Sequence, residues 1–194
     1  MAETEAAVRR FLEGEEEAFS RIARQWEKRV YNLAWRMLGN REDAQDAVQE
    51  TFLSVFKSLR SLRDPGSFST WIYRITLNHC RARRRPRAAH ISLDDAASGR
   101  VLEESGDLSG FSTASKGGEA LEALDIIRKA LAGVSENHRA AVVLKEYMGL
   151  SLEELALVME CPLSTAKSRV YQGLREVQRN LVRLGFKLKE PQNP

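Results

Sequence analysis

The sequence predicts an all-α protein made of two small helical domains joined by a flexible linker, with a helix-turn-helix in the C-terminal domain. Apolar residues recur every three or four positions along most of the chain, which is the period of an amphipathic helix. This pattern stops in residues 88–118, where five glycines stand among serines and aspartates. A capping-box sequence at Ser151-Leu152-Glu153-Glu154 then opens a helix that is followed closely by another.

Composition limits the classes of protein that this chain can be. Of its 194 residues, 43% are hydrophobic, which is enough for a buried core. No apolar run is long enough to cross a bilayer and the N-terminus has no secretory pattern, so we expect a cytoplasmic protein without membrane insertion. Cys80 and Cys161 lie far apart and form no C-x-x-C pair, which favours reduced thiols.

The small net charge of +3 hides two basic segments with an acidic one between them. Residues 61–87 contain seven arginines and one aspartate, and residues 163–189 contain seven basic residues and one glutamate. Residues 88–118 contain two basic and five acidic residues. This distribution is typical of a protein that contacts nucleic acid at two separate places.

The N-terminal domain is predicted to span residues 1–87. Its first helices cover residues 5–38, with a break at Gly14. Gly39 and Asn40 are expected to end one helix and cap the next, which runs over residues 41–59. The residues expected to face inward from that helix are Ala44, Ala47, Val48, Phe52, Val55, Phe56 and Leu59.

An acidic stripe occupies the other side of the helix at residues 41–59. It consists of Asp43, Asp46, Gln49 and Glu50. Stripes of this kind are usually no more than the solvated face of a helix, and taken alone these residues favour that interpretation.

The helix that begins near Ser67 combines an apolar stripe with a basic face. Arg74, Asn78, Arg81 and Arg85 follow one another at four, three and four residues, so they share one side of the helix. Arginines bind phosphates without regard to sequence, whereas an asparagine amide can pair with a base edge. The face is therefore predicted to bind nucleic acid, the alternative being a solvated basic helix.

The C-terminal domain is predicted to span residues 119–194, with helices over residues 119–133, 135–149, 151–159 and from 164 onward. Ser135 is expected to cap the second of these. The last two helices, joined by the turn Glu160-Cys161-Pro162, have the pattern of a helix-turn-helix. Polar and basic residues crowd the start of the last helix, where such proteins read base edges in the major groove. They are Ser164, Thr165, Lys167, Ser168, Arg169, Tyr171, Gln172 and Arg175. The alternative is an ordinary helical hairpin with a basic face.

Three motifs in this order closely resemble the extracytoplasmic-function sigma factors of bacterial RNA polymerase. They read D-A-Q-D-A-V-Q-E-T-F, then F-S-T-W-I-Y-R-I-T-L-N, then Y-M-G-L-S-L-E-E-L-A-L-V-M-E-C-P-L-S-T-A-K-S-R-V. The resemblance implies that the N-terminal domain binds core RNA polymerase and the minus-ten promoter element, and that the C-terminal domain binds the minus-thirty-five element. It also implies an anti-sigma factor as a further partner.

The resemblance implies roles for individual residues. Asp43, Asp46, Gln49 and Glu50 become the polymerase-binding face, in place of a merely solvated stripe. Asn78 resembles a position that accepts a base flipped out of the non-template strand, while Arg74, Arg81 and Arg85 hold that strand. DNA melting then follows from capture of the extruded base.

Two other classes of function remain as alternatives to a sigma factor. A stand-alone helix-turn-helix repressor or activator would bind duplex DNA without polymerase and would need neither Asn78 nor the acidic stripe. An enzyme is not expected, because the three histidines are scattered and no carboxylate pair accompanies a nucleophile and base. The sequence therefore predicts no catalytic residue, no cofactor and no metal site.

Overall fold

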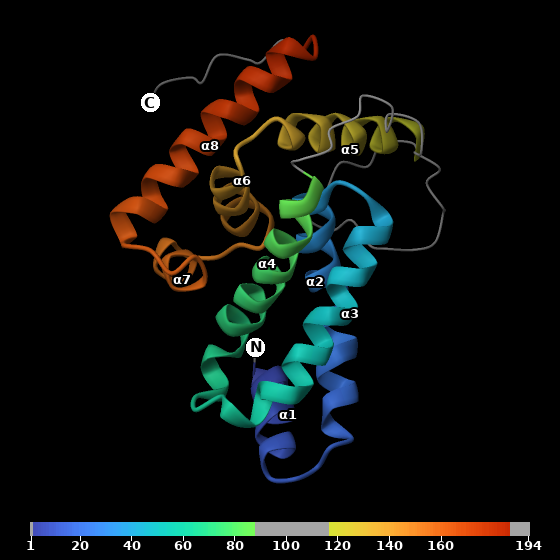
Figure 1. The fold of residues 1–194 in the computed structure, drawn as a ribbon, viewed down its shortest axis with the longest axis vertical. Helices are drawn as coiled ribbons and strands as arrows, with labels where there is room; N and C mark the ends of the chain where they lie inside the picture. The colour runs from blue at the N-terminus through green and yellow to red at the C-terminus, as the bar shows by residue number, and fades with distance from the viewer. Residues whose placement is uncertain (1, 88–116, 187–194) are drawn as a thin grey trace.

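The computed structural model describes residues 2–87 and 117–186, and every regular element within these two ranges is helical (Figure 1). This confirms the all-α prediction. The N-terminal elements are α1 (Ala2–Leu12), α2 (Ala18–Leu38), α3 (Arg41–Ser58) and α4 (Phe68–Arg87), with short 3-10 turns at Leu59–Ser61 and Pro65–Ser67. The C-terminal elements are α5 (Gly117–Ala132), α6 (Glu136–Val142), the π-helical turn η3 (Val143–Tyr147), α7 (Leu152–Val158) and α8 (Leu163–Arg183). Most of the predicted linker, residues 88–116, lies outside the described residues.

Helices α2, α3 and α4 pack around one apolar core, with α1 closing its end. Trp26 of α2 lies at its centre, with ring centroids 5.5 Å from Phe68 and 5.4 Å from Tyr73, both of α4. The indole Nε1 of Trp26 donates to Thr4 Oγ1 at 3.1 Å, so its polar atom is satisfied. The core thus fixes α4 against α2.

The connection from α2 to α3 confirms the predicted helix signals. Gly39 has φ +80°, the left-handed conformation in which a side chain would be strained. The Asn40 side chain accepts a hydrogen bond from the backbone N–H of Asp43 at 2.8 Å. One residue ends α2 and the next caps α3, which sets the orientation of the acidic stripe.

One inward residue of α3 was predicted wrongly. Phe56 is 43% exposed, whereas Thr51, which the sequence pattern left out, is fully buried and donates to Ala47 O at 2.7 Å. The buried side of α3 consists of Ala44, Ala47, Val48, Thr51 and Val55. The ring of Phe56 instead packs across the end of the module, 5.0 Å from the ring of Phe19.

The C-terminal module is built on α8, which lies across α5, α6 and α7. The capping box at the start of α7 is confirmed, since Glu154 N–H donates to Ser151 Oγ at 3.1 Å and Ser151 N–H donates to Glu154 Oε2 at 2.8 Å. Ser135 does not cap α6 through its side chain. Its backbone N–H donates instead to Glu176 of α8, a residue distant in the sequence.

The two modules contact each other directly. The guanidinium of Arg139, on α6, is 3% exposed and donates to Met37 O at the end of α2 at 2.9 Å. It also donates to Ala132 O and Val134 O of its own module, at 2.7 and 2.9 Å. Helix α4 also packs against α7. None of the helices in the described ranges is long and apolar enough to span a membrane.

Candidate nucleic-acid interface

Asn78 lies on the outer face of α4, and its side chain is exposed. The opposite face buries Tyr73, Leu77 and Cys80. Burial raises the pKa of the Cys80 thiol to about 12, so this group stays protonated and takes no part in surface chemistry. The buried residues hold the helix in place and leave the amide of Asn78 available to a ligand.

The two arginines beside Asn78 contact the C-terminal module. Arg74 Nη1 lies 3.3 Å from Glu160 Oε1, in the turn before α8. Arg81 donates from Nη2 to Asn137 Oδ1 at 3.2 Å, and its Nε lies 3.5 Å from Glu136 Oε1. The guanidinium groups that were predicted to bind DNA are therefore bound here by carboxylates and an amide of the C-terminal module. The side chain of Arg85, the fourth predicted residue of this face, lies outside the described residues.

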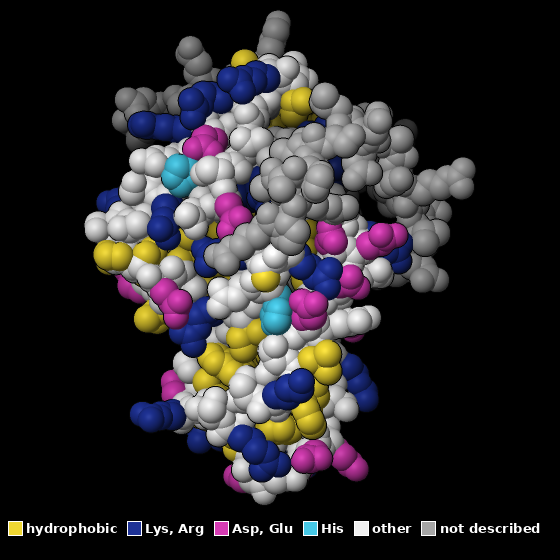
Figure 2. All heavy atoms as spheres, in the orientation of Figure 1, with side chains coloured by type: hydrophobic (Ala, Val, Ile, Leu, Met, Phe, Trp, Pro, Cys, Tyr) yellow, Lys and Arg dark blue, Asp and Glu magenta, His cyan; other side chains and the backbone are white. Residues whose placement is uncertain are grey.

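The acidic stripe lies on α3 as predicted, but it is not simply solvated. Gln49 is exposed and Asp46 is 55% exposed, whereas Asp43 lies closer to the start of α3, where its carboxylate accepts from Asn40 Nδ2. Figure 2 shows acidic side chains gathered over this part of the molecule and basic side chains along α8.

Arg83 of α4 contacts this acidic stripe and was missed in the sequence. Its Nη1 lies 3.0 Å from Asp46 Oδ2 and its Nη2 lies 2.8 Å from Glu50 Oε1. Five residues beyond Asn78, it lies about 140° around the helix, so it faces α3 and not the exposed side. Helical spacing alone places Arg83 on a different face of α4 from Arg81 and Arg85. The carboxylates that it contacts become known only from the packing of α4 against α3.

The predicted base-reading residues share the outer surface of α8. Six of them are exposed, while Thr165 and Arg169 are half-buried. The exposed ones are Ser164, Lys167, Ser168, Tyr171, Gln172 and Arg175. Inside the helix, Ala166, Val170 and Gly173 are buried against the rest of the module. The early turns of α8 therefore present mainly polar and basic side chains to solvent, with Leu163 and Leu174 exposed among them.

Glu176 fixes α8 to the corner between α5 and α6. Its Oε1 lies 2.6 Å from His138 Nδ1, and its Oε2 accepts from Ser135 N–H at 2.9 Å. Partial burial opposes ionisation, but the hydrogen bonds from Ser135 and His138 outweigh it and lower the pKa of Glu176. Asn180, one turn further on, donates to Ala130 O at 2.9 Å.

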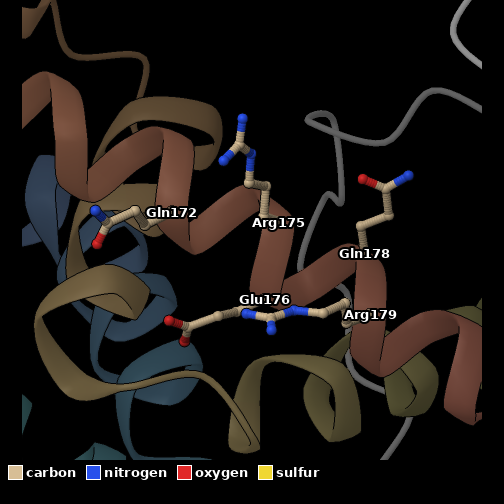
Figure 3. Close-up of a pocket in the computed structure, with 5 residues that line it drawn as sticks. All are labelled: Gln172, Arg175, Glu176, Gln178 and Arg179. Atoms are coloured by element: carbon tan, nitrogen blue, oxygen red, sulfur yellow. The ribbon is translucent and has the colours of Figure 1, made fainter.

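A shallow groove runs along α8 beside this attachment. It is lined by Gln172, Arg175, Glu176, Gln178 and Arg179. In Figure 3, Arg175 and Gln178 project away from the module while Arg179 extends towards Glu176. Two guanidinium groups and two amides suit an elongated anion with polar edges better than an apolar ligand. Within the described ranges no group of three metal-ligating side chains comes together.

Comparison with known families matches the two modules separately. Residues 22–89 match the model of sigma-70 region 2, and residues 124–177 match the model of sigma-70 region 4. The first match covers α2 to α4, which carry the acidic stripe and Asn78. The second begins within α5 and ends within α8, and it includes the helix-turn-helix.

Individual relatives match along nearly the whole chain. The sigma-E factor of Escherichia coli, an ECF RNA polymerase sigma factor, is 30% identical over 171 residues, which cover 86% of this chain and 87% of that one. The RNA polymerase sigma-H factor of Pseudomonas aeruginosa is 28% identical over 179 residues, covering 90% and 91%. Among solved structures, the sigma factor RpoE of Bartonella quintana, in complex with the anti-sigma factor NepR, is similar with a TM-score of 0.59 and 24% identity. That match covers 81% of this chain and 91% of RpoE, and it shows a shared fold.

Proposed function

This chain belongs to the extracytoplasmic-function sigma factors, which direct bacterial core RNA polymerase to promoters, and from that premise we propose which of its surfaces carry out each step. The observation that carries the proposal is the placement of three separate surfaces on one chain. They are the acidic stripe on α3, the exposed Asn78 on α4 and the polar start of α8.

The stripe of Asp43, Asp46, Gln49 and Glu50 binds core polymerase. Gln49 and Asp46 are exposed, and Glu50 is close to the surface beside them. A row of carboxylates of this kind complements a basic surface on a partner and raises the rate of association. Replacing Asp46 with asparagine is expected to weaken polymerase binding and to reduce its dependence on salt.

Helix α4 binds the minus-ten element and captures a flipped base at Asn78. The amide can donate to and accept from a base edge, while Arg74, Arg81 and Arg85 hold the phosphates of the same strand. Holding an extruded base offsets the cost of unstacking it, so the duplex opens where the base is captured.

Helix α8 binds the minus-thirty-five element in the major groove. Base-edge contacts come from Ser164, Thr165, Lys167, Ser168, Arg169, Tyr171, Gln172 and Arg175, with the early turns innermost. The attachment of Glu176 to His138 and Ser135 fixes the angle at which α8 enters the groove.

Promoter binding requires the two modules to separate from the arrangement seen here. Arg74 and Arg81 are paired with Glu160 and Glu136 of the C-terminal module, so a DNA strand can bind them only when these contacts exchange for phosphates. The pairs are partly exposed and weak enough to exchange. Binding of the N-terminal module to polymerase, together with binding of each module to its own promoter element, drives the separation.

The remaining partners follow from the same premise. An anti-sigma factor holds the chain inactive by covering the polymerase-binding surfaces, as suggested by the complex of RpoE with an anti-sigma factor. The chain acts in the cytoplasm, where the polymerase and the promoter are, and it has no catalytic activity of its own. It needs no cofactor.

Replacing Asn78 with alanine tests the division of labour between α4 and α8. We expect the variant to bind a minus-thirty-five duplex normally as holoenzyme but to lose promoter opening, measured by permanganate reactivity of unpaired thymines. Lys167→Ala or Gln172→Ala should show the reverse, with lower discrimination between promoters. Equal loss of opening and duplex binding in Asn78→Ala would contradict the assignment.

A further inference from the structure

A ladder of polar side chains joins α3 to α4 on the solvent side of the N-terminal module. Arg83 donates to Asp46 Oδ2 at 3.0 Å and to Glu50 Oε1 at 2.8 Å. One turn away, His79 Nδ1 lies 3.3 Å from Glu50 Oε2, and His79 Nε2 lies 2.9 Å from Ser54 Oγ. We call these five residues the α3–α4 ladder.

Helical spacing explains why the ladder is regular. Asp46, Glu50 and Ser54 follow one another at four residues on α3, and His79 and Arg83 are four residues apart on α4. The two helices run antiparallel and side by side (Figure 1), so each α4 side chain falls between two α3 side chains. Glu50 is shared by both α4 residues and forms the centre of the ladder.

The ladder also offsets repulsion within the acidic stripe. Like charges three and four residues apart destabilise a helix, and Asp43, Asp46 and Glu50 stand at these spacings. Arg83 lies against all three, with Asp43 Oδ1 3.8 Å from Nη1. Burial opposes the charge of Arg83, but the hydrogen bond and charge of Glu50, with the charges of Asp46 and Asp43, outweigh it and raise its pKa. Its rigid planar fork holds two carboxylates at fixed positions, whereas the ammonium of a lysine, a point charge on a flexible stem, does not fix their geometry.

We propose that Arg83 is a positioning residue that holds Asp46 and Glu50 in the arrangement that core polymerase binds, and that links this face to the helix carrying Asn78. The inference rests on the proposed polymerase-binding face. Each carboxylate can accept several hydrogen bonds, so Asp46 and Glu50 keep acceptor capacity for the polymerase while Arg83 is bound. Because Arg83 and His79 belong to α4, polymerase bound to α3 also fixes the orientation of α4 and of Asn78.

The experiment measures the affinity of the full chain for core polymerase by fluorescence anisotropy. Arg83→Gln is expected to weaken binding about fivefold, since two carboxylates lose their bridge. Arg83→Lys keeps the charge without the fork and should recover only part of this loss. In the double variant Arg83→Gln/Glu50→Gln, the combined loss should be clearly smaller than the product of the two single losses, because both changes break the same contact.

Arg60→Gln is the matched control. Arg60 follows α3, is exposed, and pairs with Glu16 at 3.4 Å, away from the ladder. Its replacement should leave polymerase affinity unchanged. The thermal unfolding of every variant is measured alongside its binding. If Arg83→Gln is unfolded, the affinity of Arg83→Lys tests the inference instead.

Three results would overturn the inference. Unchanged affinity in Arg83→Gln, or losses that multiply in the double variant, would show that Arg83 does not act through Glu50. Tighter binding would show that Arg83 competes with the polymerase for the carboxylates. In these cases Asp46→Asn and Glu50→Gln still weaken binding, and the proposed polymerase face stands. If both of those variants bind normally, the face itself is misplaced and the inference falls with it.

Discussion

Replacing Arg139 with methionine removes three hydrogen bonds from the interior of the molecule while keeping much of the side-chain volume. The guanidinium donates to Met37 O, Ala132 O and Val134 O at 2.7 to 2.9 Å. In the described part of the chain no carboxylate lies within ion-pair distance of it; backbone carbonyls bind the guanidinium, and the charge of Glu136 acts on it from further away. The variant leaves those carbonyls without their donor.

Two opposing terms set the size of the effect. Hydrogen bonds to a charged group contribute about 1.5 to 3 kcal/mol each, so three of them amount to about 4.5 to 9 kcal/mol. Burial of the guanidinium lowers its pKa from 12.5 to about 10, which corresponds to a penalty of about 3 kcal/mol that the variant no longer carries. The difference between the two terms is about 1.5 to 6 kcal/mol, and hydration of part of the vacated space keeps the expected net loss to about 2 to 4 kcal/mol.

The assay is urea unfolding followed by circular dichroism, with Arg183→Met as the control. Arg183 is exposed in the last turn of α8, so its replacement should change the free energy of unfolding by less than about 0.5 kcal/mol. A loss below about 1 kcal/mol in Arg139→Met would refute the reasoning, because it would mean that the three carbonyls are readily hydrated.

Three further predictions concern other buried contacts. In Gly173→Ala the new Cβ would lie 2.6 Å from Val142 Cγ2 and 2.7 Å from His138 O, so α8 must shift. We expect the free energy of unfolding, measured in urea, to fall by about 2 kcal/mol, and binding to the minus-thirty-five duplex, measured by gel shift, to weaken. Normal stability and DNA binding would argue against this packing. Ser151→Ala removes the cap of α7 and should cost about 1 kcal/mol in urea unfolding, and no loss would show that the cap is replaced by water. The folded Cys80 thiol has its pKa raised from 9.0 to about 12, so the unfolded chain ionises first and stability falls as pH rises. Between pH 8 and pH 10 this lowers the free energy of unfolding by about 1.4 kcal/mol relative to Cys80→Ala, and parallel pH profiles of the two proteins would contradict it.

Local signals in the sequence were sufficient for the helix ends that depend on neighbouring residues. Gly39 and Asn40 act within four residues of themselves, and so does the capping box at Ser151, because the groups they satisfy lie in the same turn. The face of α4 that carries Asn78 was also predictable, since helical spacing alone places it opposite the core.

Contacts between distant segments were not predictable from these patterns. Ser135 was expected to cap α6, but Glu176, 41 residues away, binds its backbone N–H. No local pattern in the sequence distinguishes Arg139, which is buried because three carbonyls converge on it from two modules. The pairing of Arg83 with the acidic stripe likewise depends on how α3 packs against α4. The apolar period of one helix does not predict which helix it packs against.

The most direct test is run-off transcription from a genomic DNA library, using bacterial core RNA polymerase with and without the purified chain. Discrete start sites that appear only with the chain are expected, and their upstream sequences would share the minus-ten and minus-thirty-five elements that α4 and α8 bind. Absence of new start sites, together with tight duplex binding by the chain alone, would contradict its action as a sigma factor and favour a stand-alone helix-turn-helix regulator.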